Sequence, residues 1–409
     1  MATGADVGSL NSRSGAAEVF LAFLKLGLTS FGGPIAHLGY FREEFVVHRK
    51  WLGESAYADI VALCQFLPGP ASSQVGMAIG LSRAGYAGAL AAWTAFTLPS
   101  ATALVLFAYG VAAIGDAVGS GWLHGLKIAA VAVVAQAVLG MMRNLAPDRE
   151  RATLAVAAAV MAIAVPTAWG QVGAIVFGGI IGFVVLRRGS TLPNHTAMSV
   201  KVGRVAGAGW LILFFTLLMG LPILASGTES QSIALIDAFY RSGSLVFGGG
   251  HVVLPLLQAA VVPSGWVSND QFLAGYGAAQ AVPGPLFTFA AYLGAVIGGW
   301  VIGVLCLVAV FLPSFLLVAG ALPFWDFLRR RTWAQSSLRG INAAVVGLLL
   351  AALYHPVWTA GIAAPADFAL AMIAFLALYM WNVTPWLVVV LCAVTAGAAD
   401  IIPVGFLSR

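Results

Sequence analysis

The sequence predicts an all-α polytopic membrane protein with an inverted-topology internal repeat and discontinuous helices that form re-entrant hairpins. Three observations predict this fold. Hydrophobic residues make up 61% of the 409 residues and charged residues only 9%, whereas soluble domains carry about 25% charged residues. The segments FLKLGLTSFGGP (23–34) and QFLPGP (65–70) return as FYRSGSLVFGGG (239–250) and QAVPGP (280–285). The basic loops of the two copies fall at opposite places.

Apolar runs define the crossing elements. A helix needs about 20 apolar residues to cross a bilayer, and continuous runs of this kind indicate helices, because barrel strands would alternate over about ten residues. The runs lie near residues 86–113, 122–142, 152–186 (broken at 166–170), 206–225, 297–320, 340–354 and 366–403 (broken at 384–385). The net charge of +5 comes from scattered short loops, so it does not indicate nucleic-acid binding.

The basic loops define the orientation, since cytoplasmic loops concentrate Lys and Arg. Basic residues occupy loops 42–53 and 143–151, the central loop and the loop after residue 320, whereas 114–121, 226–232, 262–270 and 355–367 contain none. This pattern requires segments 18–47 and 57–82 to enter and leave on the cytoplasmic side as hairpins of two half-helices. The N-terminus is then cytoplasmic and the C-terminus periplasmic.

The repeat divides the chain into four parts. We predict a polar tail (1–14), a first repeat (15–190), a central loop with a linking transmembrane helix (191–230) and a second, inverted repeat (231–409). The inversion follows because loop 42–53 is basic while its counterpart near 257–268 has no Lys or Arg. Inverted repeats with discontinuous helices that meet at the membrane midplane are typical of secondary transporters. Packing alone is the alternative reason for such a duplication.

The helix breaks predict anion binding. A half-helix that begins inside the bilayer presents unsatisfied N–H groups and a partial positive charge, which favour an anion. Glycine allows close approach of the backbone, and proline is tolerated in the first turn. The predicted ligand-binding glycines are Gly32, Gly33, Gly69, Gly248, Gly249 and Gly284. A kink that serves helix packing is the alternative for any single break.

Two cations accompany the breaks. Lys25 and Arg241 each lie six residues before the Phe of Phe-Gly-Gly, and a charge deep in a bilayer usually faces a cavity, a partner or a substrate. Thr29 lies one helical turn after Lys25 on the same face. The alternative is an ion pair, with Glu18 for Lys25 and Asp237 for Arg241. A third intramembrane cation, Lys127, is replaced by Asn342 in the second copy.

Other polar residues complete the predicted site. The oxygen-binding candidates are Ser30, Ser72, Ser73 and the paired amides Gln65 and Gln280. The titratable candidates for proton coupling are Glu18, His37, Asp59, Asp237 and His251. Cys64, Cys306 and Cys392 lie far apart in apolar segments, so we expect core residues and neither a metal site nor a cofactor.

The motifs LKLGLTSFGGPIAHLGYFREEFV and QFLPGPASSQVGMAIG, with VFGGGHVVLPLL and QAVPGPLFTFAAYLG in the second half, resemble the signature of the two-domain bacterial form of the chromate ion transporter family. The resemblance spans residues 18 to 405. It implies a bacterial inner-membrane protein that exports chromate, driven by the proton motive force, with sulfate as competitor. Only the resemblance supplies chromate; the breaks and cations predict an oxyanion.

The expected mechanism is alternating access, in which the two halves rock around a site formed by four hairpin breaks. Three alternatives stay open. The first is a transporter of sulfate or another oxyanion, and the second is a passive anion channel. The third, an enzyme that acts on a phosphate-bearing lipid, lacks a nucleophile or metal cluster in the sequence. A homodimer is also compatible with the sequence.

Overall fold

The structure is a computed structural model that describes residues 7–118, 120–186, 202–328 and 331–401. All regular elements in these residues are helical, which confirms the predicted fold class. Six helical segments are long and apolar enough to cross a membrane: Ala71–Ala113, Gly121–Leu145, Ala168–Val185, Arg204–Gly227, Leu286–Leu328 and Thr332–Gly361. The three cysteines are buried, as predicted.

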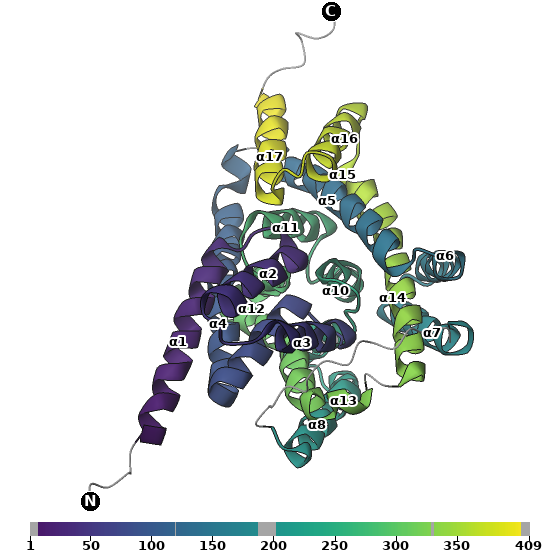
Figure 1. The fold of residues 1–409 in the computed structure, drawn as a ribbon. Helices are drawn as coiled ribbons and strands as arrows, with labels where there is room; N and C mark the ends of the chain where they lie inside the picture. The colour runs from purple at the N-terminus through teal and green to yellow at the C-terminus, as the bar shows by residue number, and fades with distance from the viewer. Residues whose placement is uncertain (1–6, 119, 187–201, 329–330, 402–409) are drawn as a thin grey trace, which may run out of the picture.

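The two copies share the order of their main helices, and the second contains additional short helical segments. Figure 1 shows how these helices are arranged. The first comprises α1 (Val7–Thr29), α2 (Gly33–Arg42), the π-helical η1 (Glu43–His48), α3 (Glu54–Phe66), α4 (Ala71–Val118), α5 (Gly121–Leu145), α6 (Arg149–Ala164) and α7 (Ala168–Val185). After the linking helix α8 (Arg204–Gly227), the second comprises α9 (Gln231–Ser244), η2 (Gly250–Val252), α10 (Val253–Val261), α11 (Asn269–Ala281), η3 (Leu286–Thr288), α12 (Phe289–Ala321), η4 (Leu322–Phe324), α13 (Trp325–Leu328), α14 (Thr332–Ala352), η5 (Leu353–Trp358), α15 (Thr359–Gly361), α16 (Pro365–Tyr379) and α17 (Pro385–Ile401).

The predicted helix breaks are present. Helices α1 and α2 are separated at residues 30–32, and α3 and α4 at 67–70. The corresponding breaks of the second copy lie at 245–249 and 282–285. Helix α4 bends at Gly85 (φ 63°) and α12 at Gly299 (φ 83°), so each joins a half-helix to a spanning helix. Helix α1 has 23 residues and begins before residue 18, so it is longer than the half-helix expected within segment 18–47.

The two copies exchange their later helices. Helix α5 packs against α16 and α17 of the second copy, whereas α14 packs against α6 and α7 of the first. Figure 1 shows both groups, with α6 and α7 beside α14 and with α16 and α17 beside α5. Glycines permit both contacts: a Cβ atom at Gly125 would lie 2.3 Å from the Cys392 carbonyl oxygen, and one at Gly340 would lie 2.0 Å from that of Gly178. The helices therefore touch backbone to backbone at equivalent places, which joins the copies into one unit.

This packing gives a stability prediction. Gly340→Ala is expected to destabilise the protein by about 1–3 kcal/mol, because the added methyl group overpacks a contact between two backbones. The measurement is the apparent melting temperature of the purified protein in detergent. Gly140→Ala is the control, since a Cβ atom there meets nothing within 4 Å. Equal melting temperatures for both variants would show that α14 and α7 separate readily.

Candidate functional site

The four helix breaks meet and exchange hydrogen bonds between the copies. The Gly69 N–H donates to the Val246 carbonyl oxygen (2.6 Å), and the Gly284 N–H donates to the Ser30 carbonyl oxygen (2.9 Å). The second break of each copy is thus bound to the first break of the other. A Cβ atom at Gly250 would lie 3.4 Å from Pro34, which also brings the first breaks of the two copies together. The four breaks therefore lie together at one location.

Two serines that were not predicted as site residues lie against these breaks. A Cβ atom at Gly69 would lie 2.4 Å from the Ser314 Oγ, and one at Gly284 would lie 2.9 Å from the Ser100 Oγ. Each serine belongs to the copy opposite its glycine. The sequence contains a signal for them, because Leu-Pro-Ser occurs at 98–100 and again at 312–314. Both glycines have positive φ angles, 124° and 97°, which side chains other than glycine adopt at a cost.

His37 connects two breaks of the first copy. Its ring is buried, with Nε2 3.2 Å from the Ser30 carbonyl oxygen and Nδ1 3.3 Å from the Ser72 Oγ. A carbonyl oxygen only accepts, so Nε2 carries the hydrogen, and in the neutral ring Nδ1 accepts from the Ser72 hydroxyl. The hydroxyl of Ser72, predicted to bind oxyanion oxygens, is therefore engaged with His37. His37, a candidate for proton coupling, therefore contacts both breaks of the first copy.

Several buried donors near the breaks have no hydrogen-bond partner within the described residues. Each of these atoms lies at a helix break or on a helix that packs beside a break. They are Ser30 Oγ, Ser73 Oγ, Thr97 Oγ1, Ser314 Oγ and Gln280 Nε2. The four hydroxyl residues are at most 2% exposed. An unsatisfied buried donor costs about 1–3 kcal/mol, so such a group points to a hydrogen-bonding partner. Ser30, Ser73 and Gln280 were predicted from the sequence, whereas Thr97 and Ser314 were not.

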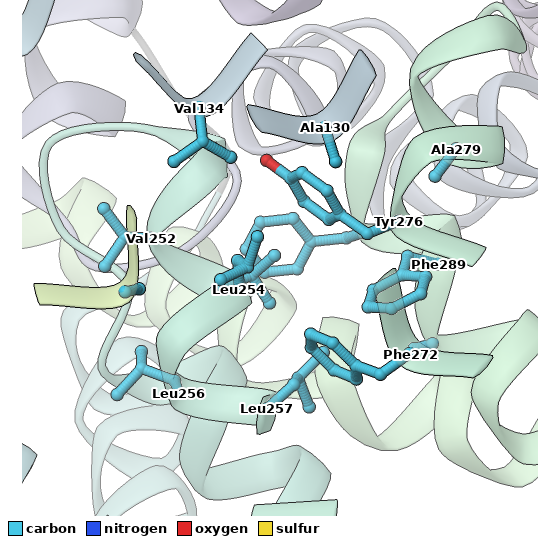
Figure 2. Close-up of a cluster of buried hydrophobic side chains, with 14 of the residues drawn as sticks. Ala130, Val134, Val252, Leu254, Leu256, Leu257, Phe272, Tyr276, Ala279 and Phe289 are labelled. Carbon is cyan, nitrogen blue, oxygen red and sulfur yellow. The ribbon is translucent and has the colours of Figure 1, made fainter. Parts of the chain in front are cut away.

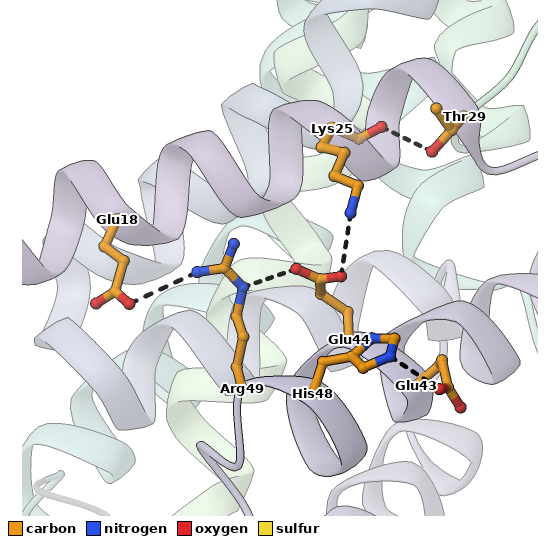
Figure 3. A network of polar contacts seen from close by, with 7 residues as sticks. All are labelled: Glu18, Lys25, Thr29, Glu43, Glu44, His48 and Arg49. Carbon is orange, nitrogen blue, oxygen red and sulfur yellow. Dashed lines mark hydrogen bonds and ion pairs between the residues drawn. The ribbon is translucent and has the colours of Figure 1, made fainter.

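The first predicted cation belongs to a surface charge network (Figure 3). The Lys25 side chain is 66% exposed, and its Nζ lies 3.5 Å from Glu44 Oε2. Arg49 contacts Glu44 at 2.7 Å and Glu18 at 3.6 Å, and Glu18 also pairs with Arg83. The alternative prediction that Lys25 pairs with Glu18 is therefore wrong. Lys25 pairs with Glu44 instead, because η1 places Glu44 beside it. The Thr29 hydroxyl, expected to face a ligand, donates to the Lys25 carbonyl oxygen.

The second predicted cation is more enclosed. Arg241 pairs with Asp237 at 2.7 Å, as the ion-pair alternative predicted, and their side chains are only 18% and 9% exposed. Its guanidinium also lies 5.4 Å from the centre of the Trp169 ring on α7. A small pocket beside it is lined by residues of α7, α9 and α10, among them Gln171 and Ser242. Both predicted cations are thus paired with carboxylates.

The remaining predicted residues divide between exposed and buried positions. Gln65 is exposed, whereas Gln280 is partly buried. Asp59 is buried on α3. His251 is partly buried, and its Nδ1 lies 2.8 Å from the Tyr276 hydroxyl. Lys127, the third cation, pairs with Asp270 at 2.9 Å.

The arrangement presents neutral donors rather than unpaired cations. Helices α2 and α4 begin at two of the breaks, so their first-turn N–H groups point toward them, and the unpartnered hydroxyls surround the same location. Helix N-termini and hydroxyl donors bind anions without a neutralising side chain. The chemistry suits an anion with several acceptor oxygens, whose charge is dispersed over many hydrogen bonds.

Comparison with known proteins gives a family-level match. A family model described as Chromate transporter matches residues 17–183 and 233–398. A chromate transport protein of Pseudomonas aeruginosa is 29% identical over 342 residues, which cover 81% of this chain and 79% of that protein. An uncharacterized transporter of Methanocaldococcus jannaschii is 28% identical over 82% of this chain and 83% of its own length. A chromate transport protein of Cupriavidus metallidurans is 22% identical, with 82% and 81% covered. No solved structure matches the chain.

Proposed function

This chain belongs to the chromate transporter family, and from that premise we propose that it exports chromate across the bacterial inner membrane and confers chromate resistance. Transport is secondary and is driven by the proton motive force. The coverage of both halves by the family model supports a transport role for the whole chain. The relatives that are named chromate transport proteins support chromate as the substrate.

The observation that carries the proposed site is the convergence of the four breaks. The paired bonds of Gly69 with Val246 and of Gly284 with Ser30 support a location shared equally by the two copies, as inverted-repeat transporters require. Chromate is a tetrahedral dianion with four acceptor oxygens. Half-helix N–H groups and the hydroxyls of Ser30, Ser73 and Ser314 would bind these oxygens.

In this proposal Lys25 and Arg241 do not bind chromate directly. Lys25 and Arg241 are paired with Glu44 and Asp237, so their fields attract the anion less than unpaired charges would. His37 is the coupling candidate with the closest connection to the breaks, since it contacts Ser30 and Ser72. Protonation of its Nδ1 would displace the Ser72 hydrogen, which would then point elsewhere. Proton binding and oxygen binding would be linked through this hydroxyl.

The test is chromate uptake into proteoliposomes that contain the purified protein, with and without a pH gradient. We expect gradient-dependent uptake that sulfate inhibits. Uptake at the same rate without a gradient would favour the channel. Uptake of sulfate alone would favour the other oxyanion transporters.

The same assay tests the neutral donors. The double variant Ser73→Ala, Ser314→Ala is expected to raise the KM for chromate by roughly a hundredfold or more, because two hydrogen bonds to a charged group are each worth about 1.5–3 kcal/mol and each 1.4 kcal/mol is about tenfold. Ser226→Ala is the control, since its exposed hydroxyl donates to the Ile223 carbonyl oxygen at the end of α8. An unchanged KM in the double variant would remove these hydroxyls from the site.

A further inference from the structure

We propose that the two copies are held in different conformations, with access to the four breaks open beside α3 and closed beside α11 by a Lys127–Asp270 latch. This inference rests on the proposed function. It assigns roles to two residues that the site itself does not use. The argument compares α3 with α11 and then α5 with α14, since each pair occupies equivalent places in the repeat.

The closed side is densely packed. Residues 272–279 of α11 are all buried, and α11 packs against both α5 and α17. Figure 2 shows Tyr276 and Leu254 in one apolar cluster with Ala130 and Val134 of α5. At Gly277 a Cβ atom would lie 2.5 Å from the Leu126 carbonyl oxygen, so the two backbones are in close contact.

The open side lacks this packing. Helix α3 packs against α4 of its own copy, and within the described residues it makes no extensive contact with α14 or α7, the counterparts of α5 and α17. The exposed residues include Gln65 at the end of α3, whereas its counterpart Gln280 has a buried amide nitrogen. Lys25 and Thr29 are also exposed, while Arg241 is largely enclosed. Lys25, Thr29 and Gln65 of the first copy are therefore accessible, whereas Arg241 and Gln280 of the second are partly buried.

A charge pair bridges α5 and α11 on the closed side. Lys127 of α5 lies 2.9 Å from Asp270 at the start of α11, with the lysine 14% and the aspartate 74% exposed. The equivalent residues of the other copy are Asn342 and Ser55, which carry no charge. At these two equivalent positions an ion pair therefore joins α11 to α5, whereas the counterparts on α3 and α14 are uncharged. The difference favours a resting conformation that is closed beside α11.

The basic loops indicate which side of the membrane the open side faces. Helix α3 follows loop 42–53, which contains three basic residues, whereas α11 follows loop 262–270, which contains none. Cytoplasmic loops concentrate basic residues, so the accessible side faces the cytoplasm. A resting conformation of this kind takes up its anion from the cytoplasm, as an exporter must. Release on the other side requires α11 to leave α5 while α3 approaches α14.

Cross-linking tests the proposal in the full-length protein in proteoliposomes. The pair Lys127→Cys, Asp270→Cys is expected to react with a short bifunctional methanethiosulfonate without substrate, and the link should stop transport until a reductant restores it. The matched pair is Ser55→Cys, Asn342→Cys. It should cross-link little at rest and more when chromate is added. Equal cross-linking of both pairs at rest would overturn the proposal.

Thiol labelling provides a readout that does not depend on these substitutions. Gln65→Cys should react with a water-soluble maleimide roughly tenfold faster than Gln280→Cys, since a covered thiol reacts only through local opening. The parent protein, whose three cysteines are buried, gives the background rate of labelling. Faster labelling of Gln280→Cys would also overturn the proposal. Resting cross-linking and thiol labelling are both measured without chromate, so absence of transport would reject the proposed function without affecting these two readouts.

Discussion

Gly69→Ala is expected to abolish chromate transport. Gly69 has a φ angle of 124°, and a residue other than glycine in such a conformation costs about 1–3 kcal/mol. The added methyl group would also lie 2.4 Å from the Ser314 Oγ. Relief of either strain moves the Gly69 N–H away from the Val246 carbonyl oxygen, and this bond joins the copies at the site. The measurement is initial chromate uptake by proteoliposomes with matched protein content.

The control for this variant is Gly39→Ala. Gly39 lies in α2, has no positive φ angle, and a Cβ atom there meets nothing within 4 Å. Alanine also favours a helix by about 1 kcal/mol over glycine, so this variant should fold and transport normally. Normal uptake by Gly69→Ala would show that the break tolerates displacement, and the proposed site would then lie elsewhere.

Arg241→Gln is expected to reduce the amount of folded protein sharply, whereas Lys25→Gln has a small effect. Removal of one partner from a buried ion pair costs about 3–5 kcal/mol, and Asp237 is only 9% exposed. Lys25 is 66% exposed, and surface ion pairs contribute about 0–1 kcal/mol. The measurement is the monodisperse fraction and the melting temperature of each variant after extraction in detergent.

The double variant Asp237→Asn, Arg241→Gln separates stability from transport. It leaves no unpaired buried charge, so folded protein should return. Chromate uptake by this variant should also return in large part, because the proposed site uses neutral donors. A stable double variant without uptake would instead place the Arg241 charge in the site, as the sequence alone suggested.

Features that depend on neighbouring residues could be predicted from the sequence without a structure. Low charge and long apolar runs imply membrane helices, and clusters of glycine with proline favour helix ends, so the breaks beside Gly33 and at Pro68–Gly69 were predicted close to their observed places. Each depends on a few adjacent residues. The pairing of Asp237 with Arg241 was also predictable, because helix geometry places residues four apart on one face.

Contacts between residues that are far apart in the sequence could not be predicted in this way. Lys25 pairs with Glu44 rather than Glu18, because the α1–α2 hairpin folds η1 back beside α1. Ser314 was not predicted as a site residue, because Gly69, which it contacts, is far away in sequence. The repeated Leu-Pro-Ser motif is the only sequence signal for it. The different packing of α3 and α11 is likewise invisible in two similar motifs.

By itself the sequence determined a helical membrane protein with a duplicated pattern of helix breaks, because composition and backbone preference act locally. Only the tertiary structure decided which groups join the breaks, with Gly69 bound to Val246 and Gly284 to Ser30, and that Lys25 pairs with Glu44. The physical reason is that hydrogen bonds and ion pairs act over a few ångströms. Which groups come within that range depends on how the two copies pack together.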